Sequence, residues 1–212
     1  AHEAGVMGFH DKRLTTELLG LNPAGTRTPT IGAMISFHRA HANGLPIPLV
    51  TPSVLRGSRY NWREPGKLEM FVDFETVNNV FDNFDGFPAT TTTNMIFMIG
   101  LGWCTDGETF EYRAWYVKEL TDNALRDMVE DFMQFANDLC VEYATPYPNM
   151  YHWSNAEPSW LSTAVDRLFS DGGPVFNPTL CDAMKVLTDD SVCIRDVFGY
   201  SLKQVSKGLA TI

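Results

Sequence analysis

The chain has 212 residues and a formal net charge of -10, and 44% of its residues are hydrophobic and 20% charged. This length and composition are typical of one globular domain, or of one domain with an appendage. No apolar run approaches the roughly 20 residues that a membrane-spanning helix needs, so we expect no membrane partner. The acidic charge argues against indiscriminate binding to nucleic acid, which usually shows a basic excess.

The first part of the chain, residues 1–65, differs in pattern from the rest. Short helices are predicted near residues 14–19 and 31–41, and three prolines within residues 44–52 predict an extended connector. The chain opens with neither a signal peptide nor an initiator methionine. We therefore expect residues 1–65 to be a helical lead-in or linker that follows an upstream module of a longer protein.

Residues 66–212 have an α/β pattern. An apolar run that ends in acids predicts a strand over residues 68–75. The nearly continuous apolar stretch 94–103 predicts a buried strand, and alternation over residues 109–117 predicts a third strand after a turn. These residues are expected to form one domain around a mixed sheet.

Helices are predicted to follow these strands. A long amphipathic helix is expected to begin after Thr121, a plausible N-terminal cap, and a short fourth strand is expected over residues 149–153. Further helices are predicted over residues 158–169, 179–187 and 201–209. Three consecutive strands, a helix, a strand and then helices are the order of a ribonuclease H-like fold, with a mixed sheet and flanking helices.

Two acids lie on the first predicted strand. Because side chains alternate along a strand, Asp73 and Glu75 share one face and Phe74 points to the other. Paired carboxylates repel each other unless a cation or proton lies between them, and Mg²⁺ and Mn²⁺ take oxygen ligands. An isolated Asp-x-Glu is usually solvated surface, but its position in an apolar strand predicts less exposure here. The pair is therefore a candidate metal site.

A third acid, Glu157, follows the fourth predicted strand, just before Pro158 at the start of a helix. One interpretation is stabilisation of the helix N-terminus, worth about 0.3–1 kcal/mol. The other is a third carboxylate that faces Asp73 and Glu75 across the sheet. His152 is expected to be a buried core histidine.

These segments resemble a known family. Residues 71–76 (Phe-Val-Asp-Phe-Glu-Thr) resemble motif I of the DEDD exonucleases. Residues 95–102 resemble the second strand of the YprB-like ribonuclease H domains that accompany RecB-family nucleases. Residues 151–157 (Tyr-His-Trp-Ser-Asn-Ala-Glu) resemble motif II of that group, with Glu157 where many relatives carry Asp. Residues 181–184 and 200–205 are similar to a later Asp-containing helix and a Ser-Leu-Lys segment.

The resemblance implies a metal-dependent nuclease that hydrolyses DNA or RNA, as a 3′–5′ exonuclease, with two Mg²⁺ or Mn²⁺ ions. Asp73 would bridge both ions, Glu75 would bind the ion that activates water, and Glu157 would hold the second. It also implies an upstream RecB-like nuclease module in the same chain. A metal-binding site would explain acidic charge in a nuclease, since bound cations offset carboxylates.

The family's last acid normally follows the Ser-Leu-Lys segment, and the sequence ends at Ile212. We expect that the fourth carboxylate lay beyond this end, so that the fragment itself would bind metal weakly and cleave poorly. Asp182 is kept among the candidate catalytic acids, either near the metals or as a structural acid.

Candidate contacts to nucleic acid are basic or aromatic. Arg56, Arg59, Arg63 and Lys67 precede the key strand, where they form either a phosphate-binding patch or an ordinary solvated loop. Lys203 is a further candidate for phosphate contact. Trp153 is a candidate for base stacking, although aromatic residues at strand ends more often belong to the core.

Two alternatives remain open. The second hypothesis is a non-catalytic ribonuclease H-like module that binds nucleic acid or protein partners. An unrelated enzyme class is disfavoured because the sequence contains no nucleophile elbow, phosphate-binding glycine loop or dinucleotide fingerprint.

Four scattered cysteines without zinc-finger spacing predict buried reduced thiols in a cytoplasmic protein.

Overall fold

A computed structural model gives the fold. It describes residues 3–57, 62, 64, 66–77, 95–105, 107, 109–169, 172, 176 and 178–210. The chain divides into two compact units, one made of residues 1–59 and 184–212 and the other of residues 60–183. Among the described residues, none of the helices is both long and apolar enough to span a bilayer.

This division differs from the predicted boundary between residues 65 and 66. The C-terminal residues join the N-terminal segment because specific contacts link them. Val50 pairs with Ile194 in an antiparallel ladder. The imidazole Nε2 of His38 lies 2.9 Å from the carbonyl oxygen of Val197. Pairing of this kind between distant segments leaves no local signal in the sequence.

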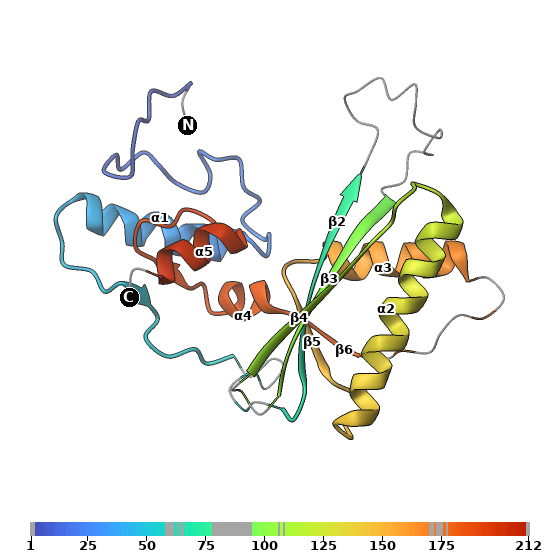
Figure 1. Cartoon of the computed structure of the whole chain (residues 1–212). Coiled ribbons are helices and arrows are strands. Elements are labelled where there is room, and N and C mark those ends of the chain that lie inside the picture. The colour runs from blue at the N-terminus through green and yellow to red at the C-terminus, as the bar shows by residue number, and fades with distance from the viewer. Residues whose placement is uncertain are drawn as a thin grey trace. The chain divides into compact units, whose positions relative to one another are not determined.

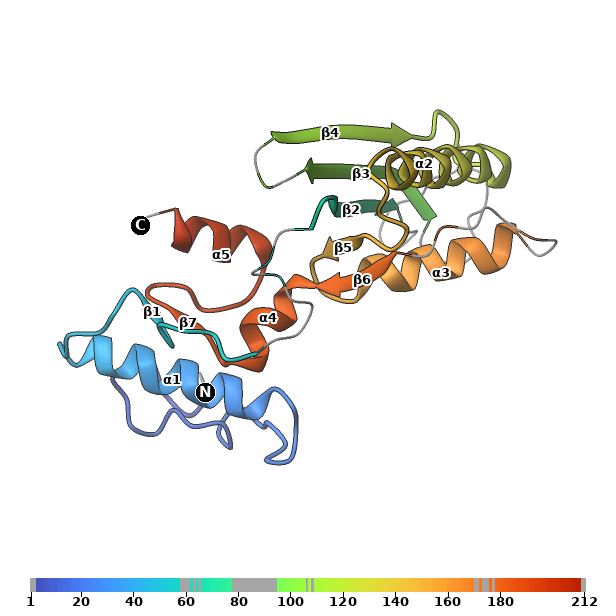
Figure 2. The ribbon, with the colours of Figure 1, turned by 90° about the horizontal axis from the view of Figure 1, so that it is seen from below.

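The first unit contains helices and a two-stranded ladder, in which β1 and β7 lie side by side (Figure 2). Its elements are α1 (Thr28–Ala42), β1 (Val50–Thr51), α4 (Ala183–Asp189), β7 (Cys193–Ile194) and α5 (Leu202–Leu209). The helix predicted near residues 31–41 is confirmed as α1, and the one predicted near 201–209 is confirmed as α5. The prediction of a helix near residues 14–19 is wrong, because that segment forms turns.

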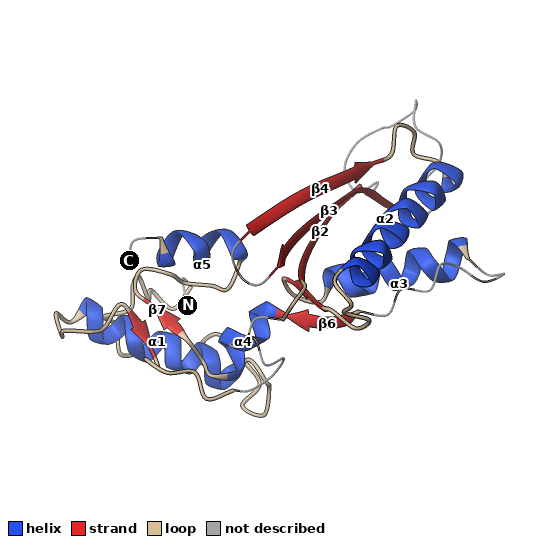
Figure 3. Ribbon diagram, turned by 60° about the horizontal axis from the view of Figure 1, so that its bottom comes forward, coloured by secondary structure: helices blue, strands red, loops and turns tan. Residues whose placement is uncertain are grey.

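The second unit is built on a five-stranded mixed sheet in the order β4-β3-β2-β5-β6. Its strands are β2 (Glu69–Val77), β3 (Met95–Thr105), β4 (Thr109–Tyr116), β5 (Asn149–His152) and β6 (Thr179–Asp182). The first three strands form an antiparallel meander, visible in Figure 3. The last two run parallel to β2. The predicted α/β class with a mixed sheet and flanking helices is confirmed.

Helices α2 (Asp122–Glu142) and α3 (Ala156–Leu168) cover one face of this sheet (Figure 1). The predicted cap is present, since the hydroxyl of Thr121 accepts a hydrogen bond from the backbone N–H of Ala124 at 3.3 Å. Apolar residues of α2 and of the covered sheet face form the main core. Phe132 of α2, which is fully buried, packs there against the rings of Phe74 on β2 and Trp115 on β4.

One predicted helix needs correction. The helix predicted over residues 179–187 is in fact the edge strand β6 followed by the short helix α4. Four residues of strand are too few for a periodic signal to stand out against the helix that follows. This correction matters for the site because it places Asp182 at the end of a strand parallel to β5.

Candidate functional site

Asp73 and Glu75 lie on the uncovered face of β2. Burial alternates along this strand as predicted, with Val72 and Phe74 buried in the core and both acids exposed. The expected shared face of the two acids is therefore confirmed. The expectation that the apolar strand shields them is wrong, because both acids are exposed, whereas the described helices α2 and α3 pack on the opposite face of the sheet.

An irregularity in the ladder follows Glu75. Glu75 pairs with Met98 and the next residue, Thr76, pairs with Ile96, which leaves Phe97 as an extra residue on β3. A bulge of this kind bends the strand and locally redirects its side chains. The regular alternation that sets the direction of both acids therefore ends just after Glu75.

Asp73 and Asp182 lie on β2 and β6, the two strands that flank β5 in the parallel part of the sheet. Phe71 of β2 pairs with Tyr151 of β5, which in turn pairs with Cys181 of β6. Asp182 ends β6 opposite His152, the last residue of β5. Because these strands are parallel, their carboxyl ends meet at one edge of the sheet, and Asp73 lies two residues beyond Phe71 toward this edge.

Glu157 lies in the first turn of α3, immediately after β5, and only 7% of its surface is exposed. Its Oε2 lies 3.8 Å from Nδ1 of His152, which is also buried. That distance is too long for a hydrogen bond, and this carboxylate oxygen has no hydrogen-bond partner within the described part of the chain. The predicted burial of His152 is confirmed.

The surroundings of Glu157 favour its protonated form. Burial is the largest effect that raises the pKa of its carboxyl group, and the negative charges of Asp73 and Asp182 raise it further. Its own backbone N–H donates to the carboxylate and opposes the rise. A carboxyl with a raised pKa beside other acids is a common feature of functional sites and of cation sites. Three of the four predicted acids therefore interact electrostatically.

Asp182 also has a structural role. Its Oδ1 accepts a hydrogen bond from the backbone N–H of Ser154 at 3.1 Å. Ser154 has a φ of 77°, a left-handed conformation that is uncommon for residues other than glycine. The bond therefore links the end of β6 to the strained turn that leads into α3 and Glu157.

The acids do not form a ready-made metal centre. Within the described residues, no group of three or more His, Cys, Asp or Glu side chains is placed to hold a metal ion. The structure brings Asp73, Glu157 and Asp182 within electrostatic range and places Glu75 further along β2 on the face of Asp73. Three of the four predicted acids thus lie within electrostatic range of one another, and metal binding by them stays a prediction.

The predicted basic residues are scattered. Arg56 and Lys203 are exposed and belong to the first unit, where the backbone N–H of Arg56 donates to Asp190. Arg59 and Arg63 lie outside the described residues. Lys67 is exposed, but it precedes β2 at the end opposite to the acids.

The distance along β2 explains why Lys67 is not beside the acids. From Glu69 to Asp73 the strand alone spans roughly 13 Å. Lys67 is therefore not adjacent to the acids along the strand, and its contact with phosphate stays a prediction. A basic run close in sequence to an acid is not close in space when an extended strand separates them.

The aromatic candidates include residues that sequence reasoning did not assign. Trp153, the predicted stacking residue, is half-buried in the turn after β5. On the face of Asp73, the ring of Phe71 stacks on that of Tyr151 at 5.4 Å and lies 6.0 Å from that of Phe110. The available signal was strand alternation, which puts Phe71 and Asp73 on one face.

The cysteines are unpaired, and all four are among the described residues. Cys140, Cys181 and Cys193 are buried, as predicted, while Cys104 is half-buried. Burial raises the pKa of each of the three buried thiols, that of Cys181 to about 11. Thiols of this kind are poor nucleophiles at neutral pH.

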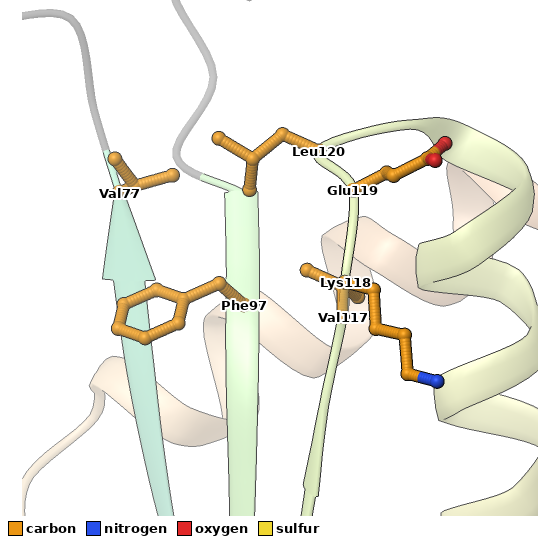
Figure 4. Close-up of a pocket in the computed structure, with 6 residues that line it drawn as sticks. All are labelled: Val77, Phe97, Val117, Lys118, Glu119 and Leu120. Atoms are coloured by element: carbon orange, nitrogen blue, oxygen red, sulfur yellow. The ribbon is translucent and has the colours of Figure 1, made fainter.

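A separate hollow of about 250 Å³ lies near the ends of the meander strands (Figure 4). Its walls are mostly apolar, and they are formed by Val77, Phe97, Val117, Lys118, Glu119 and Leu120. Since no predicted site residue lines this hollow, it is distinct from the acidic cluster.

No protein-family model matches this chain, and the curated proteins contain no match to it.

Proposed function

We propose that this chain is a divalent-metal-dependent nuclease with a ribonuclease H-like fold, which hydrolyses phosphodiester bonds in DNA or RNA. The observation that carries the proposal is the state of Glu157. This carboxylate is buried, one of its oxygens has no hydrogen-bond partner within the described residues, and two other acids raise its pKa. A cation is the ligand that would stabilise such a group of carboxylates.

The sheet supports the proposed fold. Its three-stranded meander is followed by a helix and then by a strand that joins the other side of β2, parallel to it. The acids come from the middle of β2, from the start of α3 and from the end of β6. Ligand sites in sheets with parallel strands commonly form at the carboxyl ends of those strands.

The donor set suits a hard cation. Asp73, Glu75 and Glu157 offer carboxylate oxygens, the ligands that Mg²⁺ and Mn²⁺ prefer. Asp73 and Glu75 would hold one ion and Glu157, with Asp73, a second. When bound, the ions would supply an activated water and stabilise the charge on the leaving oxygen. Movement of the exposed Asp73 and Glu75 side chains would be needed, since the acids are not grouped at ligating distances.

The chain's own residues contribute positioning and desolvation. The turn at Ser154, bonded to Asp182, fixes the entry into α3 and so the position of Glu157. Burial of Glu157 excludes water from its carboxylate, which strengthens its interaction with any charge nearby. The resemblance to DEDD exonucleases adds cleavage from the 3′ end and an upstream RecB-like module as parts of the proposal.

The test is a calorimetric titration of the chain with Mn²⁺, beside the variants Asp73→Asn and Glu157→Gln. Glu130→Gln, which changes an exposed acid on α2, is the matched control. We expect saturable binding that is lost in both site variants and retained in the control, followed by Mn²⁺-dependent cleavage of a labelled oligonucleotide. Binding that is equal in all four proteins would contradict the proposal.

The second candidate is a non-catalytic module of the same fold that binds nucleic acid or protein partners. The observation in its favour is the lack, within the described residues, of a group of three acids at ligating distances. Nucleic-acid binding without Mn²⁺ binding, and without cleavage, would favour this candidate.

A further inference from the structure

Two glycines of β3 lie on the sheet face that carries Asp73. Gly102 pairs with Phe71 and Gly100 pairs with Asp73 across the antiparallel ladder. Directly opposed residues of such a ladder point to the same face, and their Cβ positions are about 4.5–5.5 Å apart. The positions on β3 directly opposite Phe71 and Asp73 therefore carry no side chain.

Aromatic side chains from β4 fill these places. A Cβ on Gly100 would lie 2.7 Å from the hydroxyl oxygen of Tyr112, and a Cβ on Gly102 would overlap the ring of Phe110. The hydroxyl of Tyr112 thus lies over the residue directly opposite Asp73. The ring of Phe110 lies over the residue opposite Phe71, and the centroids of the Phe110 and Phe71 rings are 6.0 Å apart.

These rings remain open to solvent. Phe110 is 63% exposed, Tyr112 60% and Phe71 39%. One side of each β4 ring packs on the backbone of a glycine, and the other side is free. Exposed apolar groups that are contiguous on a surface commonly mark a binding site. The exposed patch formed by Phe110, Tyr112 and Phe71 continues along β2 to the acids, because Phe71 and Asp73 lie two residues apart on the same face.

We propose that Phe110, Phe71 and Tyr112 form a nucleotide subsite beside the acids, and this rests on the proposed function. A base of an unpaired strand stacks on Phe110 and Phe71, and the hydroxyl of Tyr112 donates a hydrogen bond to a phosphate that a bound divalent cation would hold beside Asp73. The two covered glycines are roughly 7 Å apart along the strand, a span that one nucleotide bridges between its base and a phosphate. Stacking of this kind tolerates any base.

The substrate class that follows is a single strand bound without sequence preference. A duplex would keep its bases stacked on each other and unavailable to the rings. The acidic face also predicts that binding needs a divalent cation, since Asp73 and Glu75 repel phosphates. Tyr112 is a positioning residue on this account, and Phe110 supplies stacking area.

The test measures binding of a labelled oligothymidylate by fluorescence anisotropy with Mn²⁺ present, and cleavage of the same strand. The variants are Phe110→Leu, which keeps an apolar side chain, and Tyr112→Phe, which removes only the hydroxyl. Tyr147→Leu is the matched control, because Tyr147 is 71% exposed and precedes β5 at the end of that strand remote from the acids. Thermal unfolding checks that each variant is folded.

We expect Phe110→Leu to weaken binding about tenfold, in line with the loss of one stacked base. The loss should vanish on an oligonucleotide whose bases are removed. Tyr112→Phe should lower kcat with little change in KM. Tyr147→Leu should match the unaltered chain in both assays.

The outcomes separate this subsite from the proposed function. Cleavage by the unaltered chain, with both site variants equal to Tyr147→Leu, would overturn the subsite and leave the nuclease proposal standing. Base-dependent binding lost in Phe110→Leu, without any cleavage, would support the subsite and overturn the nuclease. Self-association abolished by Phe110→Leu, without strand binding, would show that the rings bind a second copy and would overturn the subsite.

Discussion

Nδ1 of His152 lies 3.8 Å from Oε2 of Glu157, and both side chains are buried. His152 ends β5 and Glu157 lies in the first turn of α3, so the short turn between them brings the two groups together. At this distance they interact through charge and dipole rather than through a hydrogen bond. Glu157 is therefore a buried acid that costs free energy when it ionises, which several measurements can test.

The first prediction concerns the pH dependence of stability. Burial, together with the charges of Asp73 and Asp182, raises the pKa of Glu157 above its ordinary value in the folded chain, so the fold disfavours the ionised form. The stability that the Glu157 carboxyl group contributes is fully present at pH values below its pKa in the unfolded chain. This stability is lost as the pH rises through its pKa in the folded chain. Glu157→Gln should therefore raise the free energy of unfolding at neutral pH, by an amount that shrinks toward pH 4.5.

Urea unfolding of both proteins over this pH range measures the difference. Glu130→Gln is the control, because Glu130 is exposed on α2 and its replacement should change stability little. A Glu157→Gln protein that is less stable than the unaltered chain at neutral pH would show that the carboxylate is stabilised by contacts that outweigh its burial.

A second prediction separates the charge of Asp182 from its hydrogen bond. Asp182→Asn keeps an oxygen that accepts from the N–H of Ser154 and removes the negative charge that acts on Glu157. Asp182→Ala removes both. We expect both variants to lower the pKa of Glu157, and only the Ala variant to lose about 1–3 kcal/mol of stability for the unpaired buried group. Carbon NMR titration of the Glu157 carboxyl and chemical unfolding provide the two measurements.

A third prediction tests the strained turn. Ser154 has a φ of 77°, where a β-branched side chain is strongly disfavoured. Ser154→Val should destabilise the fold by about 1 kcal/mol or more, whereas Ser154→Gly should be neutral or gain up to about 1 kcal/mol. Thermal unfolding of both variants gives the comparison. Equal losses in the two would indicate that the serine hydroxyl, and not the backbone, is what the turn requires.

A fourth prediction concerns the core that supports the sheet. The ring of Phe132 packs edge-on against those of Phe74 and Trp115, with centroid distances of 6.2 and 5.6 Å. Phe74 lies between the two acids in sequence, on the opposite face of β2. Phe132→Ala should cost about 3–5 kcal/mol of unfolding free energy. Tyr147→Ala, at an exposed position, should stay within about 0.5 kcal/mol of the unaltered chain.

The sequence by itself determined most of the secondary structure of the second unit. Alternating burial predicted that Asp73 and Glu75 share a face of β2, since strand periodicity depends on local backbone geometry alone. The N-terminal cap at Thr121 and the amphipathic pattern after it predicted α2 for the same reason. The short strand β6 was missed because four residues carry little periodic signal.

Only the tertiary structure decided which groups meet. Pairing of β2, β5 and β6 brings Asp73, Glu157 and Asp182 into electrostatic range, although more than 100 residues separate the first from the last. The same strand geometry keeps Lys67 away from the acids. Local sequence patterns indicate which secondary structure each residue favours by itself. The proximity of distant acids, and the resulting pKa of Glu157, depend on strand order and burial, which arise only when the sheet assembles.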